Sequence, residues 1–197
     1  MSRLIETIRL ENGKFDRLEY HQQRVDHSLK SIFPASGILN LEKILNNVAF
    51  PKEGLFKCRI VYDNQNHTIE FTPYIIRSVS SLRMAERNSI SYPFKFENRA
   101  ELVEAFTCRQ NSDDVLIIKN GKVTDTSYSN IVFKKGSKWT TPTSCLLKGT
   151  MRQFLLDKGA IQEEEITVTD IDQFEKFKLI NSMIGWDGEE INVSNIV

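Results

Sequence analysis

Hydrophobic and polar positions change their period several times along the chain, which indicates alternating strands and helices. Residues 4–10 are rich in Ile and Leu and lead into Asn12-Gly13, the usual pair in a two-residue β-hairpin turn. Residues 19–33 carry apolar side chains at helical spacing, and Pro34 follows them. The chain therefore begins with a hairpin and a helix.

The same criteria predict the remaining elements and a mixed α/β, α+β-like architecture with mostly antiparallel pairing. Asn120-Gly121 indicates a second hairpin turn, Thr150 and Gln153 have capping-box spacing, and Gly159 suits a helix C-terminus. Further strands are expected at 56–63, 68–72, 74–84, 115–119, 122–125, 130–134, 138–141, 161–168 and 178–183, helices at 41–48, 97–108 and 150–158, and a helical turn at 169–174.

A polar stretch at residues 85–89 is the candidate linker between two domains. It divides the chain into an N-terminal α+β domain, residues 1–86, and a C-terminal α/β domain, residues 87–197. At 197 residues, the chain is long enough for either one large domain or two small ones.

Composition excludes several classes of function. Lys and Arg number 26, as do Asp and Glu, so no net field favours nucleic acid or an anionic membrane. Three cysteines without CxxC spacing predict free thiols in a reducing compartment, and the three histidines have no metal-ligand spacing. No apolar run reaches the roughly twenty residues of a membrane span, and the N-terminus has no signal-peptide pattern. We therefore expect a cytoplasmic protein without bound metal.

Lys95 is the first candidate for chemistry. It lies between Phe94 and Phe96, shortly after Tyr92-Pro93, where a strand gives way to a helix. Apolar surroundings disfavour the charged ammonium, and a neutral lysine amine can form a Schiff base with an aldehyde. The alternative is a lysine whose stem covers a phenylalanine ring while its charge stays in water.

An aldehyde cofactor such as pyridoxal phosphate also needs an acid for its ring nitrogen and donors for its phosphate. Asp125 lies at a strand end among hydroxyl side chains, although it could equally be a turn aspartate. Gly149-Thr150 begins a helix whose N-terminus would favour a phosphate, or is simply a helix cap. Arg24 could supply a cationic fork, and Asn181-Ser182 interrupts an apolar strand with polar groups that need partners.

Five motifs in this order resemble the class IV aminotransferase family of pyridoxal-phosphate enzymes, over nearly the whole chain. They are His-x-x-Arg, Lys-Phe-Glu-Asn-Arg, Asn-Gly-x-Val-Thr-Asp-Thr-Ser-Tyr-Ser-Asn-Ile-Val-Phe, Leu-Leu-x-Gly-Thr-x-Arg and Leu-Ile-Asn-Ser-Met. The family includes aminodeoxychorismate lyase, D-amino-acid aminotransferase and branched-chain aminotransferase.

The resemblance implies a role for each candidate. Lys95 matches the Schiff-base lysine and Asp125 the acid that pairs with the pyridine nitrogen, whereas the matching positions for the phosphate are Arg24, Gly149, Thr150, Met151, Asn181 and Ser182. It also implies a two-domain fold with the cofactor in the cleft between domains, usually in a homodimer. The chain departs from the family in two ways: Asp125 stands where Glu is more frequent, and the usual leading strand and loop are missing.

The resemblance implies two possible reactions on a small amino substrate. The Lys-x-x-Asn-Arg sequence that begins at Lys95 is slightly more similar to 4-amino-4-deoxychorismate lyase, which releases pyruvate and forms 4-aminobenzoate. The alternatives are an aminotransferase for branched-chain or D-amino acids and a non-catalytic relative that retains the fold. Arg59, on a predicted strand, is a candidate contact for a substrate carboxylate or else part of a structural ion pair. The sequence alone does not choose the substrate.

Overall fold

The computed structural model describes residues 3–35 and 37–197, which divide into two compact units. Unit 1 comprises Met1–Ile76 and Phe94–Asn98, and unit 2 comprises Arg77–Pro93 and Arg99–Val197. The first boundary between the units therefore follows Ile76, earlier than the predicted boundary after residue 86. The segment Phe94–Asn98 belongs to unit 1 again.

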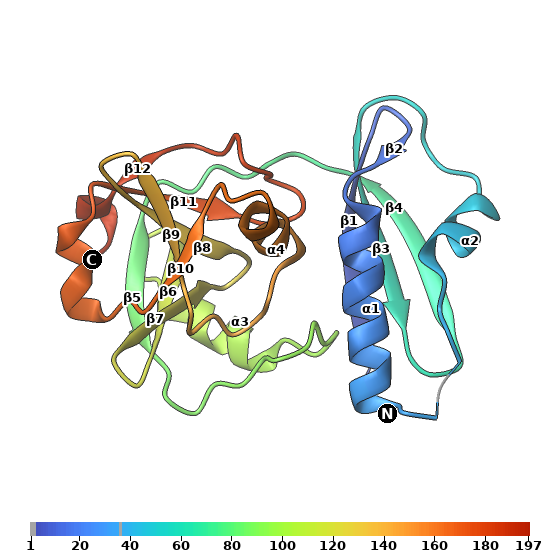
Figure 1. Cartoon of the computed structure of the whole chain (residues 1–197), viewed down its shortest axis with the longest axis horizontal. Coiled ribbons are helices and arrows are strands. Elements are labelled where there is room, and N and C mark those ends of the chain that lie inside the picture. The colour runs from blue at the N-terminus through green and yellow to red at the C-terminus, as the bar shows by residue number, and fades with distance from the viewer. Residues whose placement is uncertain (1–2, 36) are drawn as a thin grey trace. The chain divides into compact units, whose positions relative to one another are not determined.

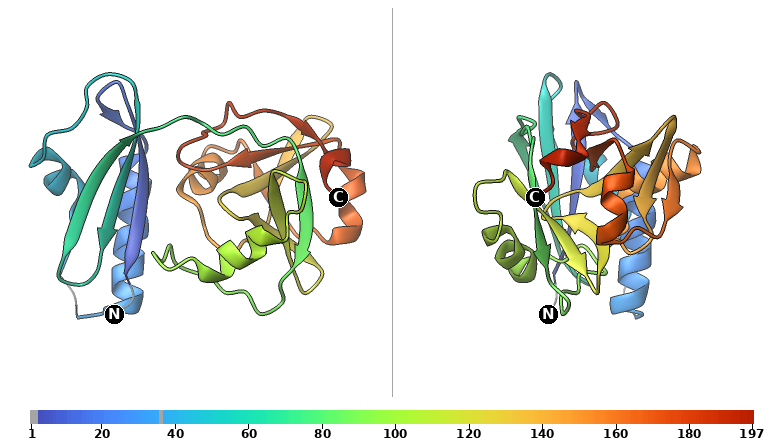
Figure 2. Two further views of the ribbon diagram at one scale, coloured as in Figure 1. Left: turned by 180° about the vertical axis from the view of Figure 1, so that it is seen from behind. Right: turned by 90° about the vertical axis from the view of Figure 1, so that its left-hand side faces the viewer.

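Unit 1 is an antiparallel sheet with a helix against one face. Its strands have the order β2-β1-β3-β4. Figure 1 shows α1 in front of this sheet, and the opposite view in Figure 2 (left) shows it behind the strands. The elements are β1 (Leu4–Glu11), β2 (Lys14–Phe15), α1 (Leu18–Ile32), α2 (Leu41–Asn46), β3 (Leu55–Tyr62) and β4 (His67–Pro73).

The core of unit 1 lies between this sheet and α1. Every second residue of β1 is fully buried, including Leu4 and Ile8, because alternate side chains point to one face of a strand. Val25 and Leu29, four residues apart, present one side of α1 to them. The alternation of a strand and the spacing of a helix thus meet in one hydrophobic core.

Both predicted Asn-Gly turns are confirmed. Asn12 and Gly13 have φ of 48° and 78°, and Asn120 and Gly121 have φ of 51° and 75°. A two-residue turn of type I′ needs positive φ at both positions, which asparagine tolerates and glycine adopts without steric cost.

Unit 2 contains the larger sheet, with the strand path β10-β9-β8-β7-β6-β5 and β11 joined to β8. Its pairing is antiparallel except for β5 with β6 and β9 with β10. The strands are β5 (Leu82–Glu86), β6 (Asp114–Lys119), β7 (Lys122–Thr126), β8 (Asn130–Lys135), β9 (Lys138–Pro142), β10 (Gln162–Glu164), β11 (Lys176–Ile180) and β12 (Ile191–Asn192). The helices are α3 (Ala100–Thr107) and α4 (Thr150–Asp157), with 3-10 turns η1 (Val168–Gln173) and η2 (Val193–Asn195).

The predicted strand at 74–84 and linker at 85–89 are wrong. Only Leu82–Glu86 forms a strand, and it pairs with β6 in unit 2 rather than completing unit 1. Leu82 and Ala85 are buried, whereas the residues between them are partly or largely exposed. An edge strand with one solvent-exposed face carries many polar residues. This explains why the sequence at the end of β5 resembled a linker.

Other boundaries also differ from the sequence prediction. Thr150 is not the N-cap of α4, because Gly149 occupies that position and has no side chain with which to cap the helix. The strand expected at 178–183 ends at Ile180, so Asn181 and Ser182 lie in the turn that follows. The strand expected at 161–168 is limited to β10.

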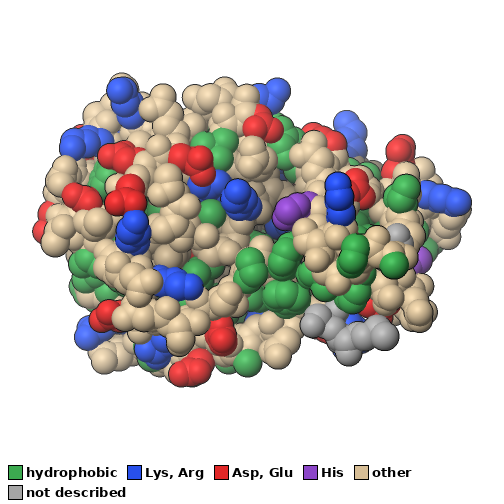
Figure 3. Space-filling model, turned by 60° about the horizontal axis from the view of Figure 1, so that its bottom comes forward, with side chains coloured by type: hydrophobic (Ala, Val, Ile, Leu, Met, Phe, Trp, Pro, Cys, Tyr) green, Lys and Arg blue, Asp and Glu red, His purple; other side chains and the backbone are tan. Residues whose placement is uncertain are grey.

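Charge is mixed over the surface. Acidic and basic side chains are interspersed on the face shown in Figure 3, as the equal numbers of the two signs lead one to expect. Over residues 3–35 and 37–197, no helix has the length and apolar character needed to cross a bilayer, and no cluster of three or more His, Cys, Asp or Glu residues is arranged for a metal ion.

Candidate functional site

Lys95 is fixed in unit 1 by backbone hydrogen bonds on both sides. The N–H of Ile5 donates to the carbonyl of Lys95 at 2.9 Å, and the N–H of Glu97 donates to that of Arg3 at 2.9 Å. Phe96 forms a β-bridge with Leu4. The lysine is therefore held on the edge of β1, half-buried, and the helix expected directly after it begins only at Ala100 in unit 2.

Glu6 is the centre of a buried charged cluster in the same unit. His21 Nδ1 lies 2.5 Å from its carboxylate, and Arg24 donates to it through Nε at 2.9 Å and Nη2 at 2.5 Å. Burial raises the pKa of Glu6, but the charge of Arg24 and the hydrogen bond from His21 outweigh burial and hold the pKa at about 2. Glu6 is thus an ionised carboxylate with 0% exposure.

His21 is neutral in this cluster. Burial lowers its pKa more strongly than the hydrogen bond and charge of Glu6 raise it, and the charges of Arg24 and Lys95 lower it further. The hydrogen bond to Glu6 assigns the proton to Nδ1. The other ring nitrogen, Nε2, is buried and has no hydrogen-bond partner within the described part of the chain.

Arg59, the candidate for a substrate carboxylate, has an acidic partner in the structure. Its Nη2 donates to Glu97 at 3.0 Å, and Arg3 pairs with the other carboxylate oxygen at 2.6 Å. Arg59 follows Cys58, whose buried side chain packs in the core against α1, so Arg59 points to the opposite face of the sheet. The structure therefore does not bring Arg59 to the Arg24 cluster.

Asp125 on β7 is held by three hydrogen bonds in unit 2. The backbone N–H groups of Leu146 and Leu147 donate to Oδ2, each at 2.9 Å, and Asn130 Nδ2 donates to Oδ1 at 2.7 Å. Burial raises the pKa of Asp125 to about 6, although the three hydrogen bonds act in the opposite direction.

Gly149 owes its identity to Asn130. A Cβ at position 149 would lie 2.1 Å from Asn130 Oδ1, so any side chain there would have to displace Asn130. Asn130 Nδ2 also donates to the Leu147 carbonyl at 2.9 Å, so one amide holds both Asp125 and the loop before α4. The close approach, rather than an unusual φ, requires glycine here, since Gly149 has φ −68°.

The N-terminus of α4 follows this loop. Thr150 and Met151 are 4% and 2% exposed, and the N-cap, Gly149, has no side chain with which to cap the helix. The first N–H groups of a helix lack partners within the helix and carry a partial positive charge, which favours an anion. One nitrogen of the Arg152 guanidinium is already engaged, because Nη2 donates to the Pro142 carbonyl at 3.0 Å and to Glu163 at 2.5 Å.

Asn181 connects the turn after β11 to the segment that precedes Asn130. Its Nδ2 donates to Ser129 Oγ at 2.9 Å, and its Oδ1 accepts from the N–H groups of Met183 and Ile184. Ser182 is half-buried in the same turn. Unit 2 therefore brings together Asp125, the Gly149 loop and Asn181, which the sequence predicted separately.

Sequence reasoning missed Glu6 and Asn130. Glu6 occupies an inward position of a strand between the buried side chains of Leu4 and Ile8, and that position was a usable signal. Asn130 gave no such signal, because its role depends on contacts with Asp125 and Leu147 that folding creates.

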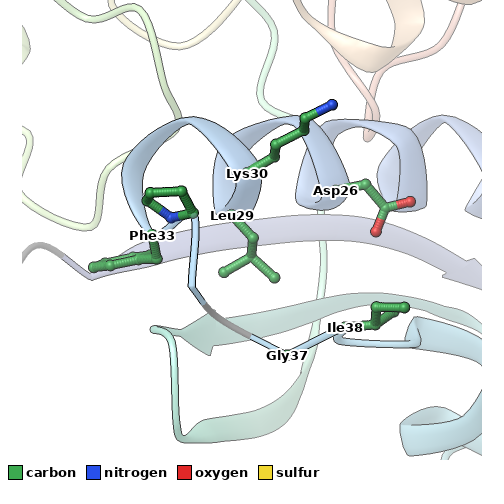
Figure 4. A pocket seen from close by; sticks show the side chains of 7 residues that line it. Asp26, Leu29, Lys30, Phe33, Gly37 and Ile38 are labelled. Atoms are coloured by element: carbon green, nitrogen blue, oxygen red, sulfur yellow. The ribbon is translucent and has the colours of Figure 1, made fainter.

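A separate hollow in unit 1 lies beside the end of α1 and has a volume of about 270 Å³. Figure 4 shows Leu29 pointing from α1 toward the segment that carries Gly37 and Ile38. The carboxylate that lines this hollow, Asp26, already accepts a hydrogen bond from Gln22 at 2.7 Å. The lining residues are Asp26, Leu29, Lys30, Phe33, Pro34, Gly37 and Ile38, none of which belongs to the charged cluster of Glu6, His21 and Arg24.

A family model described as amino-transferase class IV matches residues 3–187. The chain belongs to this family. The resemblance seen in the five sequence motifs is therefore confirmed, as is the mixed α/β fold expected for a class IV protein.

Individual relatives agree with this assignment. The chain is 36% identical to an "uncharacterized protein" of Haemophilus influenzae, over 92% of this chain and 98% of the relative. It is 34% identical to a "putative 4-amino-4-deoxychorismate lyase" from Haemophilus somnus 129pt, whose crystal structure matches with a TM-score of 0.89 over 94% of this chain and 98% of that one. A "putative aminodeoxychorismate lyase" of Schizosaccharomyces pombe is 30% identical over 83% of this chain and 77% of the relative.

Proposed function

We propose that this class IV chain binds pyridoxal phosphate and cleaves 4-amino-4-deoxychorismate into 4-aminobenzoate and pyruvate. The observation that carries the choice of reaction is the likeness to the Haemophilus somnus protein of that name, at 34% identity over almost all of both chains. Cofactor binding has separate support from the residues around Arg24 in unit 1 and around Asp125 in unit 2.

The side chains present fit the groups of this cofactor. In unit 2, the uncapped N-terminus of α4 offers backbone donors for a phosphate. Asp125 accepts two hydrogen bonds at Oδ2 but one at Oδ1 from the described residues, so Oδ1 can accept the N–H of a pyridinium ring. In unit 1, Lys95 would hold the aldehyde carbon and Arg24 would bind the phosphate. Asn181 and Ser182 would support the phosphate from the turn after β11.

Each residue then has a defined task. Pyridoxal phosphate, when bound, supplies an electron sink next to the substrate carbon that bears the nitrogen. Lys95 would act as the general base that removes the proton from that carbon. Asp125 would hold the ring nitrogen, and a positive charge there would favour its ionised form over the protonated form that burial favours. Loss of this proton would allow the ether bond of the substrate to break. The three-carbon group would leave as enolpyruvate and take up a proton to become pyruvate, while the six-membered ring of the substrate becomes aromatic.

Borohydride reduction tests the cofactor assignment. Protein mixed with pyridoxal phosphate should turn yellow, and reduction should fix the cofactor to the peptide that contains Lys95, as read by mass spectrometry. A colourless protein that cannot be reconstituted, or a label on another lysine, contradicts the proposal and favours a relative that retains only the fold.

A single-turnover assay tests the reaction. The lyase should form 4-aminobenzoate and pyruvate in equal amounts while the cofactor remains in its aldehyde form. An aminotransferase would instead convert the cofactor to its amine form when given an amino acid. Rapid formation of the amine form with branched-chain or D-amino acids, without 4-aminobenzoate production, would replace the lyase assignment.

A further inference from the structure

Glu6 accepts two hydrogen bonds from one edge of the Arg24 guanidinium. Nε donates to Oε1 at 2.9 Å and Nη2 donates to Oε2 at 2.5 Å, which is the parallel two-bond arrangement of an arginine fork. The Glu6 side chain is 0% exposed and that of Arg24 is 12% exposed. Because a guanidinium is planar and rigid, these two bonds fix the orientation of all five N–H donors.

His21 in turn fixes Glu6. Its Nδ1 lies 2.5 Å from Oε2, and both side chains are 0% exposed. The three side chains thus form a chain of contacts from the first turn of α1 to β1 and back to α1 one turn later. Nothing in the register of β1 requires a carboxylate at this inward position, where its neighbours on the same face are Leu4 and Ile8.

Stability alone does not account for this cluster. The free energy needed to desolvate a buried ion pair is about as large as the attraction between its charges. Apolar side chains of similar size would therefore stabilise the core equally well. A buried pair is instead suited to holding a charged group in one orientation. Arg24 is the member of the cluster with some exposure, and therefore the member that can meet a ligand.

We propose that Glu6, itself held by His21, is a positioning residue that orients the Arg24 guanidinium toward the phosphate of the cofactor. The inference rests on the proposed function. Glu6 accepts two of the five N–H donors and directs the plane that carries the others. Without Glu6, Arg24 would have to be ordered at the moment of binding, and the affinity for phosphate would fall.

The test compares two ligands that differ only in the phosphate. Dissociation constants for pyridoxal phosphate and for pyridoxal are measured spectroscopically on the wild type and on Glu6→Gln. We expect Glu6→Gln to weaken pyridoxal phosphate binding by about 10–100-fold, the usual effect of losing an outer-shell partner, and to leave pyridoxal binding unchanged. In an Arg24→Gln background, Glu6→Gln should have no further effect on the ratio of the two constants.

Glu11 on the same strand provides the matched control. Arg9 donates to a single oxygen of its carboxylate, Oε2, through Nε at 3.3 Å and Nη2 at 3.0 Å, so Glu11 also pairs with a guanidinium but lies away from the cluster. Glu11→Gln should leave the ratio unchanged. Equal weakening of both ligands by Glu6→Gln, or no weakening of either, would overturn the inference, because a merely structural role does not discriminate by phosphate.

A second measurement does not depend on the folding of Glu6→Gln. In the wild type, the Arg24 Nε–H signal in a nitrogen–proton NMR spectrum should be protected from exchange, both in the free protein and with pyridoxal phosphate bound. Loss of protection on binding would mean that Arg24 leaves Glu6 and would overturn the inference. A wild type that binds neither ligand would overturn the proposed function itself, so the two failures are distinguishable.

Discussion

Asn130 lies opposite Asp125 in the β7–β8 pair and binds two partners with one amide nitrogen. Nδ2 donates to Asp125 Oδ1 at 2.7 Å and to the Leu147 carbonyl at 2.9 Å. Its Oδ1 lies where a Cβ of residue 149 would be, at 2.1 Å. The position of the carboxylate and the identity of the glycine before α4 are therefore set by the same side chain.

The first prediction concerns Gly149→Ala. The new methyl group must displace Asn130, so we expect a loss of about 1–3 kcal/mol in the free energy of unfolding, typical of overpacking. Asn130→Ala alone should cost a similar amount, because it leaves the buried Asp125 short of a donor. The double variant should lose at least about 1 kcal/mol less unfolding free energy than the sum of the two single losses. The Asn130 amide with which the new methyl group clashes is absent from the double variant. Urea denaturation of the four proteins measures this coupling.

Gly37→Ala is the control for that cycle. A Cβ at Gly37 meets nothing within 4 Å, so its effect should stay within about 0.5 kcal/mol. Strict additivity of Gly149→Ala and Asn130→Ala would show that the amide and the glycine are independent.

The second prediction is the pH dependence caused by Asp125. Its pKa is raised from 3.8 to about 6 in the folded protein, so the folded state holds this proton more tightly than the unfolded chain. Stability attributable to Asp125 is therefore greatest in acid and falls as the pH rises through about 4 to 6, by roughly 3 kcal/mol. The difference in unfolding free energy between wild type and Asp125→Asn should change by that amount, measured without cofactor. A difference that does not vary with pH would refute the raised pKa.

The sequence predicts local structure well where local chemistry decides it. Asn12-Gly13 and Asn120-Gly121 suit only a tight turn with positive φ, and both form one. The prediction for Leu82–Glu86 was wrong for two reasons. The partner strand, β6, lies more than 25 residues further along the chain, and the exposed face of Leu82–Glu86 has the composition of a linker. Pairing over such distances leaves no local signature.

The site shows the same limit. Asp125 was identifiable as a carboxylate at a strand end, but the N–H groups of Leu146 and Leu147 that hold it come from a loop about 20 residues away. Arg59, on a predicted strand, was a candidate either for a contact with the substrate carboxylate or for a structural ion pair. Only the folded chain shows Glu97 at 3.0 Å from it.

The third prediction concerns that pair. Arg59 and Glu97 are partly exposed, at 32% and 24%, so their interaction should contribute no more than about 1 kcal/mol to stability. Because the guanidinium is already bound, we expect Arg59→Gln to leave KM for the substrate unchanged within about twofold, a binding difference of less than 0.5 kcal/mol. Steady-state kinetics at several salt concentrations checks this. A much larger rise in KM would restore Arg59 as the contact for the substrate carboxylate.

The fourth prediction concerns Lys95. Lys95→Met should lower the rate of 4-aminobenzoate formation by at least about 10²–10⁴-fold, because it removes the general base as well as the covalent attachment. Lys14→Met, at an exposed position of β2, is the control and should retain the wild-type rate. Added methylamine should restore part of the activity of Lys95→Met by replacing the missing base. Near-normal turnover by Lys95→Met would place the chemistry elsewhere.

The fifth prediction follows from the opposite pKa shift of Glu6. Its pKa is lowered from 4.5 to about 2, so its contribution to stability is complete above about pH 4.5 and is lost as the pH falls toward 2, by roughly 3 kcal/mol. The stability gap between wild type and Glu6→Gln should therefore narrow on acidification from about pH 5 to 3, in the urea unfolding of each protein. Glu11→Gln should show a small gap that changes little with pH, since Glu11 is 45% exposed. A gap for Glu6→Gln that stays constant over this range would mean that the carboxylate gains nothing from Arg24 and His21, and so could not hold the guanidinium in place.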